Sequence, residues 1–280
     1  MSIFFSSQSS AAPAAPPRVA VLVATYEPGR ALLDLLEPLI SAGTAAIIVV
    51  DDASSKPREW LLGRLAMEPT VHVVRHTVHQ GRGAALKTGM QYFLDHLRHY
   101  TGVVTVSADG QYAAEDVLRL ARALHRSPKL AIVATREFPT SGAVGRAVMP
   151  AVAERTLRLL FRAFTGIAVS DVHTRLRALP TGLLPRLVRV AGDRFEYELA
   201  ALLHIARSGY PLAEHAVAGN CDSPEVDSEF RPVADSIRMV RALTKCTPVD
   251  PFTPEHAAEE ASRNSEPTFP VRSPGAKQTR

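Results

Sequence analysis

The stretch VVTVSADGQYAAEDVLRL (residues 103–120) begins with the pattern of a buried strand and ends with that of an amphipathic helix. The helical part places apolar side chains on one face at the spacing i, i+3, i+4 and i+7: Val117, Leu120, Ala121 and Leu124. The turn between the two parts contains Asp109, Gly110 and Gln111. An aspartate at a strand end is typical of a metal or phosphate site, and an ordinary turn before Gly110 is the alternative. Ser107 stands where a second carboxylate would be wanted.

The same alternation of strand and helix patterns runs through most of the chain. Short apolar, β-rich runs, each bounded by turn residues, predict strands at 18–25, 45–52, 71–76, 102–109 and 130–136. Helical patterns fall between or after them at 29–43, 57–67, 83–97, 113–125, 148–164, 195–209 and 232–245. This order predicts right-handed βαβ units and one α/β domain with a mostly parallel, Rossmann-like sheet flanked by helices.

Composition sets the limits of the domain and narrows the class of protein. The chain has 280 residues, 46% of them hydrophobic, and a formal net charge of +4. Residues 1–17 are rich in Ser, Ala and Pro and residues 247–280 in Pro, Ser and charge, so we expect disorder at both ends and a folded domain at 18–246. Lys and Arg are scattered, which does not indicate nucleic-acid binding. We expect a cytoplasmic protein, because no apolar run is long enough to span a membrane.

Polar side chains follow three of the predicted strands. Thr25, Tyr26 and Glu27 follow the first, and the paired carboxylates Asp51 and Asp52 end the second. The fourth ends at Asp109. In open α/β sheets ligands bind at the carboxyl ends of the strands, so these groups predict a site on one edge of the sheet. Capping of the following helix is the alternative role for the two neighbouring aspartates.

Three further segments carry candidate binding residues. HQGRGAALKTG (residues 79–89) places two glycines before a helix, which allows a close backbone approach and favours an anion, or is simply a glycine turn. SDVHTRLRALP (170–180) carries arginines suited to phosphate, or is a solvated basic turn. DRFEYELA (193–200) carries Glu196 and Glu198, of which one at most is expected to face a site, where it would act as a general base.

The order of these blocks resembles family 2 glycosyltransferases of the GT-A fold, in particular bacterial proteins similar to dolichyl- and polyprenyl-phosphate sugar synthases. The matching blocks, in order, are VLVATYEPG, IIVVDDASS, RHTVHQGRGAALKTG, VTVSADGQYAAED, ATREF, FTGIAVSDVHTRLRALP, GDRFEYELAALL and SEFRPVADSIRM. They cover roughly residues 18 to 245. The resemblance implies an inverting enzyme that transfers a sugar from a UDP- or GDP-linked donor to a polyprenyl phosphate or a small-molecule acceptor.

The resemblance also implies a role for individual residues. Thr25, Tyr26 and Glu27 would line the nucleotide pocket, with Asp51 or Asp52 at the base or ribose. Gly83, Lys87, Ser107 and Arg175 would lie near the donor. Asp109 and Gln111 fall on the metal and diphosphate motif and would bind Mg²⁺ or Mn²⁺. Arg177 would contact a donor or acceptor phosphate, and Arg194, Glu196 and Glu198 match the acceptor-side helix. The catalytic residues implied are Asp109, Arg177 and Glu196.

The departures from the family pattern gather in the same segments. The pattern DADGQH reads SADGQY here, and DTQTGLR reads DVHTRLR, which brings in Ser107, Tyr112, His173 and Arg175. The loss of a carboxylate at Ser107 predicts a divalent-cation site that is weakened or dispensable. His173 as an added ligand, or Arg175 and Arg177 as cations that neutralise the diphosphate, would compensate, and the second is favoured because hard Mg²⁺ prefers oxygen ligands.

Two alternatives belong to other classes. A non-catalytic nucleotide-sugar-binding relative would keep the pocket with a degenerate metal motif. A sugar nucleotidyltransferase would carry a Gly-rich basic loop directly after the first strand, where this chain has TYEPGR. The basic, one-sided segment at 232–245 also suggests peripheral contact with a membrane, and the resemblance is compatible with a homodimer.

Overall fold

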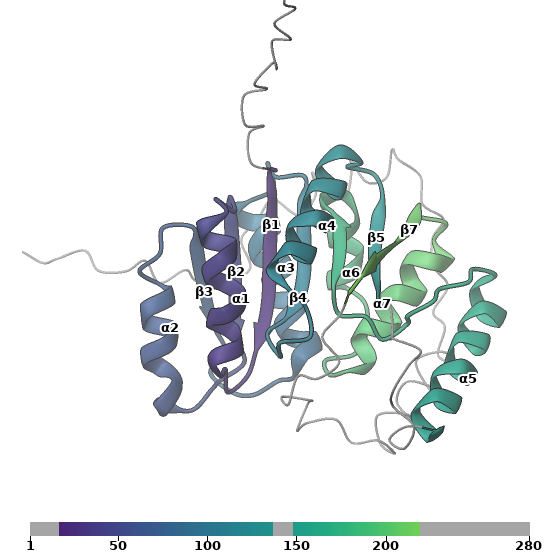
Figure 1. Ribbon diagram of the computed structural model, residues 1–280, viewed down its shortest axis with the longest axis horizontal. Coiled ribbons are helices and arrows are strands. Elements are labelled where there is room, and N and C mark those ends of the chain that lie inside the picture. The colour runs from purple at the N-terminus through teal and green to yellow at the C-terminus, as the bar shows by residue number, and fades with distance from the viewer. Residues whose placement is uncertain (1–16, 137–147, 219–280) are drawn as a thin grey trace, which may run out of the picture.

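The computed structural model describes residues 17–136 and 148–218 (Figure 1). The predicted disordered tail at 247–280, the helix at 232–245 and the last matching block at 228–239 lie outside the described residues, as does the N-terminal segment up to residue 16.

The described strands form one seven-stranded sheet in the order β3-β2-β1-β4-β6-β5-β7. Every pairing is parallel except those of β6, which runs antiparallel to β4 and to β5. The strands are β1 Val19–Thr25, β2 Ala46–Asp51, β3 Val71–Arg75, β4 Gly102–Ser107, β5 Ala131–Arg136, β6 Arg177–Pro180 and β7 Leu212–Val217. The predicted α/β class and mostly parallel sheet are therefore confirmed.

Helices cover both faces of this sheet (Figure 1). The α-helices are α1 Arg30–Ser41, α2 Glu59–Leu65, α3 Arg82–His96, α4 Ala114–Arg126, α5 Val148–Thr165, α6 Leu184–Val188 and α7 Glu196–Arg207. Two short 3-10 helices, η1 Lys56–Arg58 and η2 Thr181–Leu183, precede α2 and α6. The strands β1, β2 and β4 are buried at every position, as continuous apolar runs predict for parallel strands covered on both sides.

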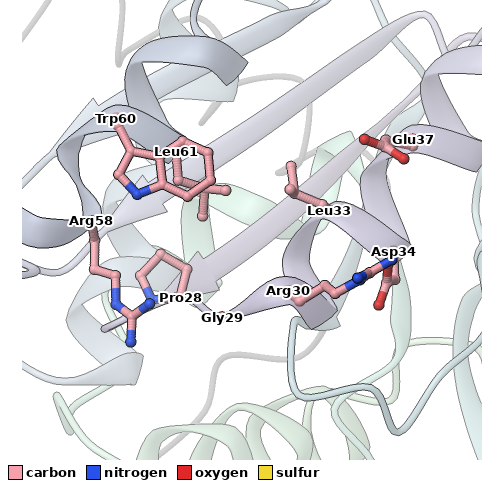
Figure 2. A pocket seen from close by; sticks show the side chains of 9 residues that line it. All are labelled: Pro28, Gly29, Arg30, Leu33, Asp34, Glu37, Arg58, Trp60 and Leu61. Atoms are coloured by element: carbon pink, nitrogen blue, oxygen red, sulfur yellow. The ribbon is translucent and has the colours of Figure 1, made fainter.

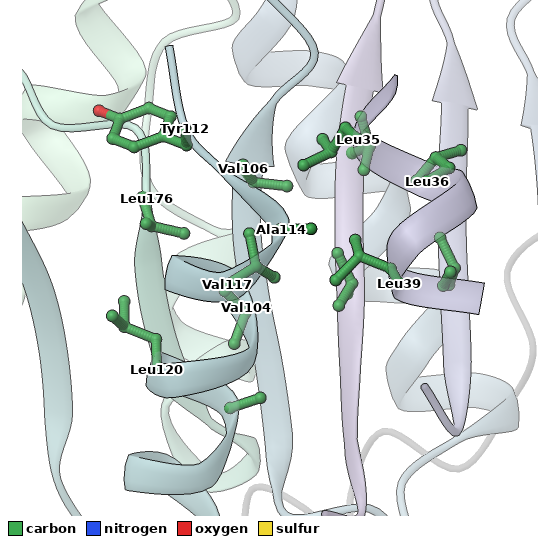
Figure 3. Close-up of a cluster of buried hydrophobic side chains, with 14 of the residues drawn as sticks. Leu35, Leu36, Leu39, Val104, Val106, Tyr112, Ala114, Val117, Leu120 and Leu176 are labelled. Carbon is green, nitrogen blue, oxygen red and sulfur yellow. The ribbon is translucent and has the colours of Figure 1, made fainter. Parts of the chain in front are cut away.

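Alternate residues of the central strands supply two separate cores. One face of the sheet packs against α1, α2 and α4, and Figure 3 shows Leu36 of α1 and Leu120 of α4 in the same buried cluster as Val104 and Val106 of β4. The opposite face packs against α3, α6 and α7. Burial of this much apolar side chain fixes the direction of each strand, so the carboxyl ends of β1, β2 and β4 meet at one edge of the sheet.

The sequence patterns did not predict β6, β7 or α6. The strand β6 has only four residues and contains both an arginine and a proline, so it lacks a recognisable apolar run. β7 is mostly half-buried or exposed, with the pattern of an edge strand. Both elements take their conformation from neighbours that are distant in the sequence, since β6 fills the gap between β4 and β5.

Candidate active site

The loops that follow β1 and β2 are joined by hydrogen bonds. The Glu27 amide donates to Ser54 Oγ at 2.8 Å, and the carboxylate of Glu27 accepts from the Ser55 amide at 2.6 Å and from Ser55 Oγ at 2.9 Å. The bond from the Ser55 amide, helped by Arg58, holds the pKa of Glu27 below its usual value. Glu27 and Ala53 have φ values of +48° and +64°, which side chains other than glycine rarely adopt. These bonds hold two strained turns in place at the edge of the sheet.

Asp51 and Asp52 are both buried and bound to protein groups. Asp51 accepts from the Ser54 amide at 3.2 Å and lies 3.0 Å from Arg75 Nε. Asp52 accepts from His76 Nδ1 at 2.6 Å and from the amides of Gln80 at 2.9 Å and Gly81 at 2.6 Å. Asp52 therefore fixes the loop that leads into α3. The predicted contact of these carboxylates with a base or ribose would have to be shared with these internal partners.

Asp52 makes the stability of the fold depend on pH. Burial alone would raise the pKa of this carboxyl, but bonds from His76 and the two amides outweigh it and hold the pKa below its ordinary value. A lowered folded-state pKa means that the carboxylate stabilises the fold above its unfolded pKa of about 3.9, and that this stabilisation is lost as the pH falls through the lower value.

We expect Asp52→Asn to lower the free energy of unfolding at pH 7 by about 1–3 kcal/mol, because an amide N–H would face the donors that Asp52 now accepts. Urea unfolding at pH 7, 5 and 3 measures this, and the difference from the native protein should shrink below about pH 4. Asp34→Asn, at an exposed pair with Arg30, is the matched control and should change little. A difference that is absent, or constant with pH, would contradict this role.

The glycines before α3 allow another part of the chain to approach. A Cβ at Gly83 would lie 2.5 Å from Tyr197 Cβ and 2.8 Å from the carbonyl carbon of Asp193. Gly81 has a φ of +109°, and a Cβ there would lie 2.5 Å from the Asp193 oxygen. Lys87 Nζ also reaches Asp193, at 2.6 Å from its Oδ1. The close backbone approach that the sequence predicted is thus made by the segment leading into α7.

The loop after β4 is bound to the loop before β6. Asp109 Oδ1 accepts from the Gln111 amide at 3.1 Å, and Asp109 Oδ2 accepts from Arg175 Nη1 at 3.0 Å. The buried Tyr112, labelled in Figure 3, accepts from the Arg175 amide at 3.1 Å. Arg136, at the end of β5, donates to Gln111 Oε1 at 3.2 Å and to the carboxylate of Asp171 at 2.7 Å. These contacts order both loops around Asp109.

An arginine cluster, defined as Arg82, Arg175 and Arg177, surrounds Glu198 of α7. Glu198 Oε2 lies 3.4 Å from Arg82 Nε and 3.9 Å from Arg175 Nε. Arg177 Nη1 donates to the Glu198 carbonyl oxygen at 2.6 Å. Burial alone would raise the pKa of Glu198, but the three guanidiniums outweigh it and hold the pKa below its ordinary value. Taken together with Asp109, the three guanidiniums and the two carboxylates carry one net positive charge, and this field favours an anion at the edge of the sheet.

The structure separates the predicted residues into two groups. Asp109, Gln111 and Arg175 come together with Arg82, and Ser107 ends the buried strand that leads to them. The guanidinium of Arg177 is buried inside the fold and donates to the carbonyl oxygens of residues 174 and 198. The N–H groups that Arg177 was predicted to offer to a substrate phosphate thus include two that already donate to backbone oxygens.

The predicted catalytic Glu196 lies at the start of α7. Its Oε1 accepts from the amides of Asp193 at 3.3 Å and Arg194 at 3.4 Å. Residues two apart on a helix point in different directions, so Glu196 and Glu198 do not face the same surroundings. The carboxylate that contacts the arginine cluster is that of Glu198. Tyr26 is 43% exposed, and its ring centre lies 4.4 Å from that of His79.

Arg82 and Arg136 were missed as site residues. Arg82 lies between the two glycines at the first turn of α3, and Arg136 is the last residue of β5, so each had a positional signal. Both positions belong to the edge where ligands bind in such sheets. The sequence did not indicate which carboxylate pairs with each guanidinium, because Glu198 and Asp171 lie far from Arg82 and Arg136 along the chain.

A pocket of about 330 Å³ opens beside this edge, between α1 and α2 (Figure 2). Figure 2 shows Trp60 and Leu61 on one side of it and Leu33 on the other. Its charged lining is paired, with Arg30 3.5 Å from Asp34 and Arg58 3.6 Å from the carboxylate of Glu27. The pocket therefore offers a mainly apolar hollow without an excess of either charge, and the arginine cluster lies outside it.

A mostly parallel sheet with one reversed strand, whose carboxyl edge carries a cationic cluster, defines an α/β protein of the GT-A type. S. aureus TarS (residues 1–349, in complex with UDP-GlcNAc) has this fold and superposes with a TM-score of 0.52 at 14% identity, over 88% of this chain and 70% of that 1–349 chain. Residues 20–175 match the profile of glycosyl transferase family 2. The chain belongs to this family.

Two curated relatives are also similar to this chain. One is an undecaprenyl-phosphate mannosyltransferase of Micrococcus luteus, 28% identical over 201 residues, which are 70% of this chain and 81% of the relative. The other is a polyprenol monophosphomannose synthase of Mycolicibacterium smegmatis, 31% identical over 153 residues, 54% of this chain and 57% of that protein. Glycosyltransferases of this family and fold generally use a nucleotide-sugar donor together with a divalent cation. The predicted family and fold are confirmed.

Proposed function

We propose that the protein transfers a sugar from a UDP- or GDP-linked donor to a polyprenyl phosphate, with inversion at the anomeric carbon. The observation that carries this proposal is the arginine cluster with its one excess positive charge at the carboxyl edge of a family 2 sheet. The two curated relatives support the lipid acceptor, since one is named an undecaprenyl-phosphate mannosyltransferase and the other a polyprenol monophosphomannose synthase.

In the proposed reaction an ionised oxygen of the acceptor phosphate attacks the anomeric carbon. A bond from that oxygen to carbon forms, the bond from carbon to the β-phosphate oxygen breaks, and its electron pair leaves with the nucleoside diphosphate. No proton has to be removed, because a phosphate oxygen is already ionised. The protein's main contribution would be to stabilise the charge that develops on the leaving diphosphate, by donors fixed in position beforehand.

The edge of the sheet has the groups that a nucleotide donor needs. The half-exposed Tyr26 and its neighbour His79 present aromatic rings on which a nucleobase could stack. Arg82 and Arg175 would face the diphosphate, since planar guanidiniums bind phosphate oxygens through paired hydrogen bonds. These groups lie on loops held by Asp52 and Asp109, so the pocket would be formed before the donor binds.

Helix α5 supports a lipid acceptor and contact with a membrane surface. Figure 1 shows α5 at the β7 side of the molecule, and Leu159 and Phe164 are large apolar side chains that are 68% and 44% exposed on it. Arg155 and Arg162 are exposed on the same helix. Apolar and basic side chains exposed together are typical of a helix that lies at an anionic membrane surface. Among the described residues, no helix is both long enough and apolar enough to cross a bilayer.

The test is a transfer assay with labelled UDP- and GDP-sugars and a polyprenyl phosphate in detergent. We expect a lipid-linked sugar as product and about a 100-fold loss of rate in Asp109→Asn, because Arg175 loses the carboxylate that orients it. Asp34→Asn, at an exposed ion pair, is the control and should retain the rate. Donor binding without transfer or hydrolysis would instead favour the alternative, a non-catalytic nucleotide-sugar-binding relative.

A further inference from the structure

The carboxylate of Asp109 is occupied on both sides by hydrogen-bond donors of the protein. Oδ1 accepts from the Gln111 amide at 3.1 Å, and Oδ2 accepts from a guanidinium N–H of Arg175 at 3.0 Å. The other predicted metal ligand, Gln111 Oε1, accepts from Arg136 Nη1 at 3.2 Å. The oxygens that the sequence assigned to a metal ion are thus turned toward arginines.

This set of donors does not fit Mg²⁺ or Mn²⁺. Such ions prefer several oxygen ligands, carboxylates above all, whereas Ser107 supplies a hydroxyl and Asp109 the one carboxylate of its loop. A dication at Asp109 Oδ2 would also lie close to the charge of Arg175, which repels it. In the part of the chain that the structure describes, His, Cys, Asp and Glu side chains form no group of three suited to a metal ion.

Arg175 is held where a cation is needed. Its guanidinium lies against Asp109 on one side and 3.9 Å from Glu198 on another, and it stacks 5.5 Å from the centre of the Phe195 ring. Burial, followed by the charge of Arg82, holds the pKa of Arg175 below its usual value. The side chains of Arg175 and Arg82 are 13% and 10% exposed, so both reach the surface of the cluster.

We propose that Arg175, together with Arg82, binds and neutralises the leaving nucleoside diphosphate in place of a divalent cation. The inference rests on the proposed function and concerns the same site. Fixed guanidiniums hydrogen-bond phosphate oxygens in pairs, and they supply positive charge without a metal ion. Arg177 holds the backbone beside the cluster in place, because its guanidinium donates to the carbonyl oxygens of Thr174 and Glu198.

The test compares the native protein with Arg175→Gly, with Arg175→Lys and with the double variant Ser107→Asp/Arg175→Gly. UDP and GDP are the probes, titrated by calorimetry in EDTA and in MnCl₂, and binding of Mn²⁺ alone is followed by electron paramagnetic resonance. Thermal unfolding of each variant checks that it is folded. Arg64→Gln, on an exposed surface of α2, removes a positive charge elsewhere and is the control.

For the native protein we expect nucleoside diphosphate affinity to be the same in EDTA and in MnCl₂ within about 3-fold. Arg175→Gly should weaken the affinity for the nucleoside diphosphate in EDTA by about 10- to 100-fold, because a charge-assisted hydrogen bond is lost. The affinity of Arg175→Lys should lie between those of the native protein and Arg175→Gly. The double variant has carboxylates at positions 107 and 109 and lacks the guanidinium of Arg175. It should bind Mn²⁺ and should bind the diphosphate at least about 10-fold more tightly with Mn²⁺ than without it.

Two results would overturn the inference, and they are distinguishable. A native protein that binds Mn²⁺ through Asp109, and that requires it for UDP or GDP, would overturn the substitution of metal by arginine while leaving the proposed transfer intact. Failure of both diphosphates to bind in either buffer would overturn the proposed function as well. Equal affinities of Arg175→Gly and Arg64→Gln in EDTA would also count against Arg175.

Discussion

Replacing Glu198 with glutamine is expected to lower the free energy of unfolding by about 3 kcal/mol, the cost of leaving buried charges without their partner. Glu198 is 8% exposed and lies among Arg82, Arg175 and Arg177, whose charges hold its pKa below the ordinary value. The melting temperature should fall by about 6–12 °C for a domain of this size. Differential scanning calorimetry measures the change directly.

Glu196→Gln is the matched control, because it makes the same chemical change two residues earlier on the same helix. Glu196 accepts long hydrogen bonds from the backbone amides of Asp193 and Arg194, so the loss of its charge should cost less than about 1 kcal/mol. In Glu198→Gln the cluster keeps its three guanidiniums and loses one carboxylate, so UDP should raise the melting temperature of this variant more than that of the native protein. Equal destabilisation by the two substitutions would contradict the central place of Glu198.

Replacing Gly83 with alanine is expected to destabilise the fold by about 1–3 kcal/mol through overpacking. The added Cβ would lie 2.5 Å from Tyr197 Cβ and 2.9 Å from the backbone oxygen of Arg194. Neither neighbour is the end of a flexible side chain, so the start of α3 would have to move away from α7. This movement would carry Arg82 away from Glu198, and nucleoside diphosphate affinity should fall together with stability.

Gly63→Ala is the control for this second substitution. Gly63 lies in α2, where an added Cβ meets nothing within 4 Å, so alanine should stabilise the helix by about 0.5–1 kcal/mol. Urea unfolding of the two variants therefore should give changes of opposite sign. A Gly83→Ala protein as stable as the native one would show that α3 and α7 do not need their close approach.

The sequence was sufficient for the parts of the fold that are set by local pattern. Strands β1 to β5 and helices α1 to α5 and α7 were predicted because buried apolar runs and helical spacing are visible in a single segment. The strand β6 was not, because its four residues become a strand only between β4 and β5. The edge of the sheet that carries the candidate site was predicted from the alternation of strands and helices, which places the carboxyl ends of parallel strands together. Asp109 follows β4 at this edge.

The partners of each site residue could not be predicted in the same way. Helical spacing indicated that Glu196 and Glu198 would not both face a site, but the packing of α7 on α3 decides that Glu198 does. Arg175 was recognised as a cation suited to phosphate, while its ion pair with Asp109 depends on two loops 66 residues apart. Such pairings are set by tertiary structure, which a periodic pattern does not encode.

Hydrogen–deuterium exchange with UDP and GDP, in EDTA, is the most direct test of where the nucleoside diphosphate binds. If the arginine cluster is the diphosphate site, ligand should slow exchange in peptides covering residues 79–83, 107–113 and 171–175. Protection confined to residues 28–37 and 58–61, which line the pocket between α1 and α2, would place the ligand elsewhere and contradict the account. So would the absence of protection with either nucleotide.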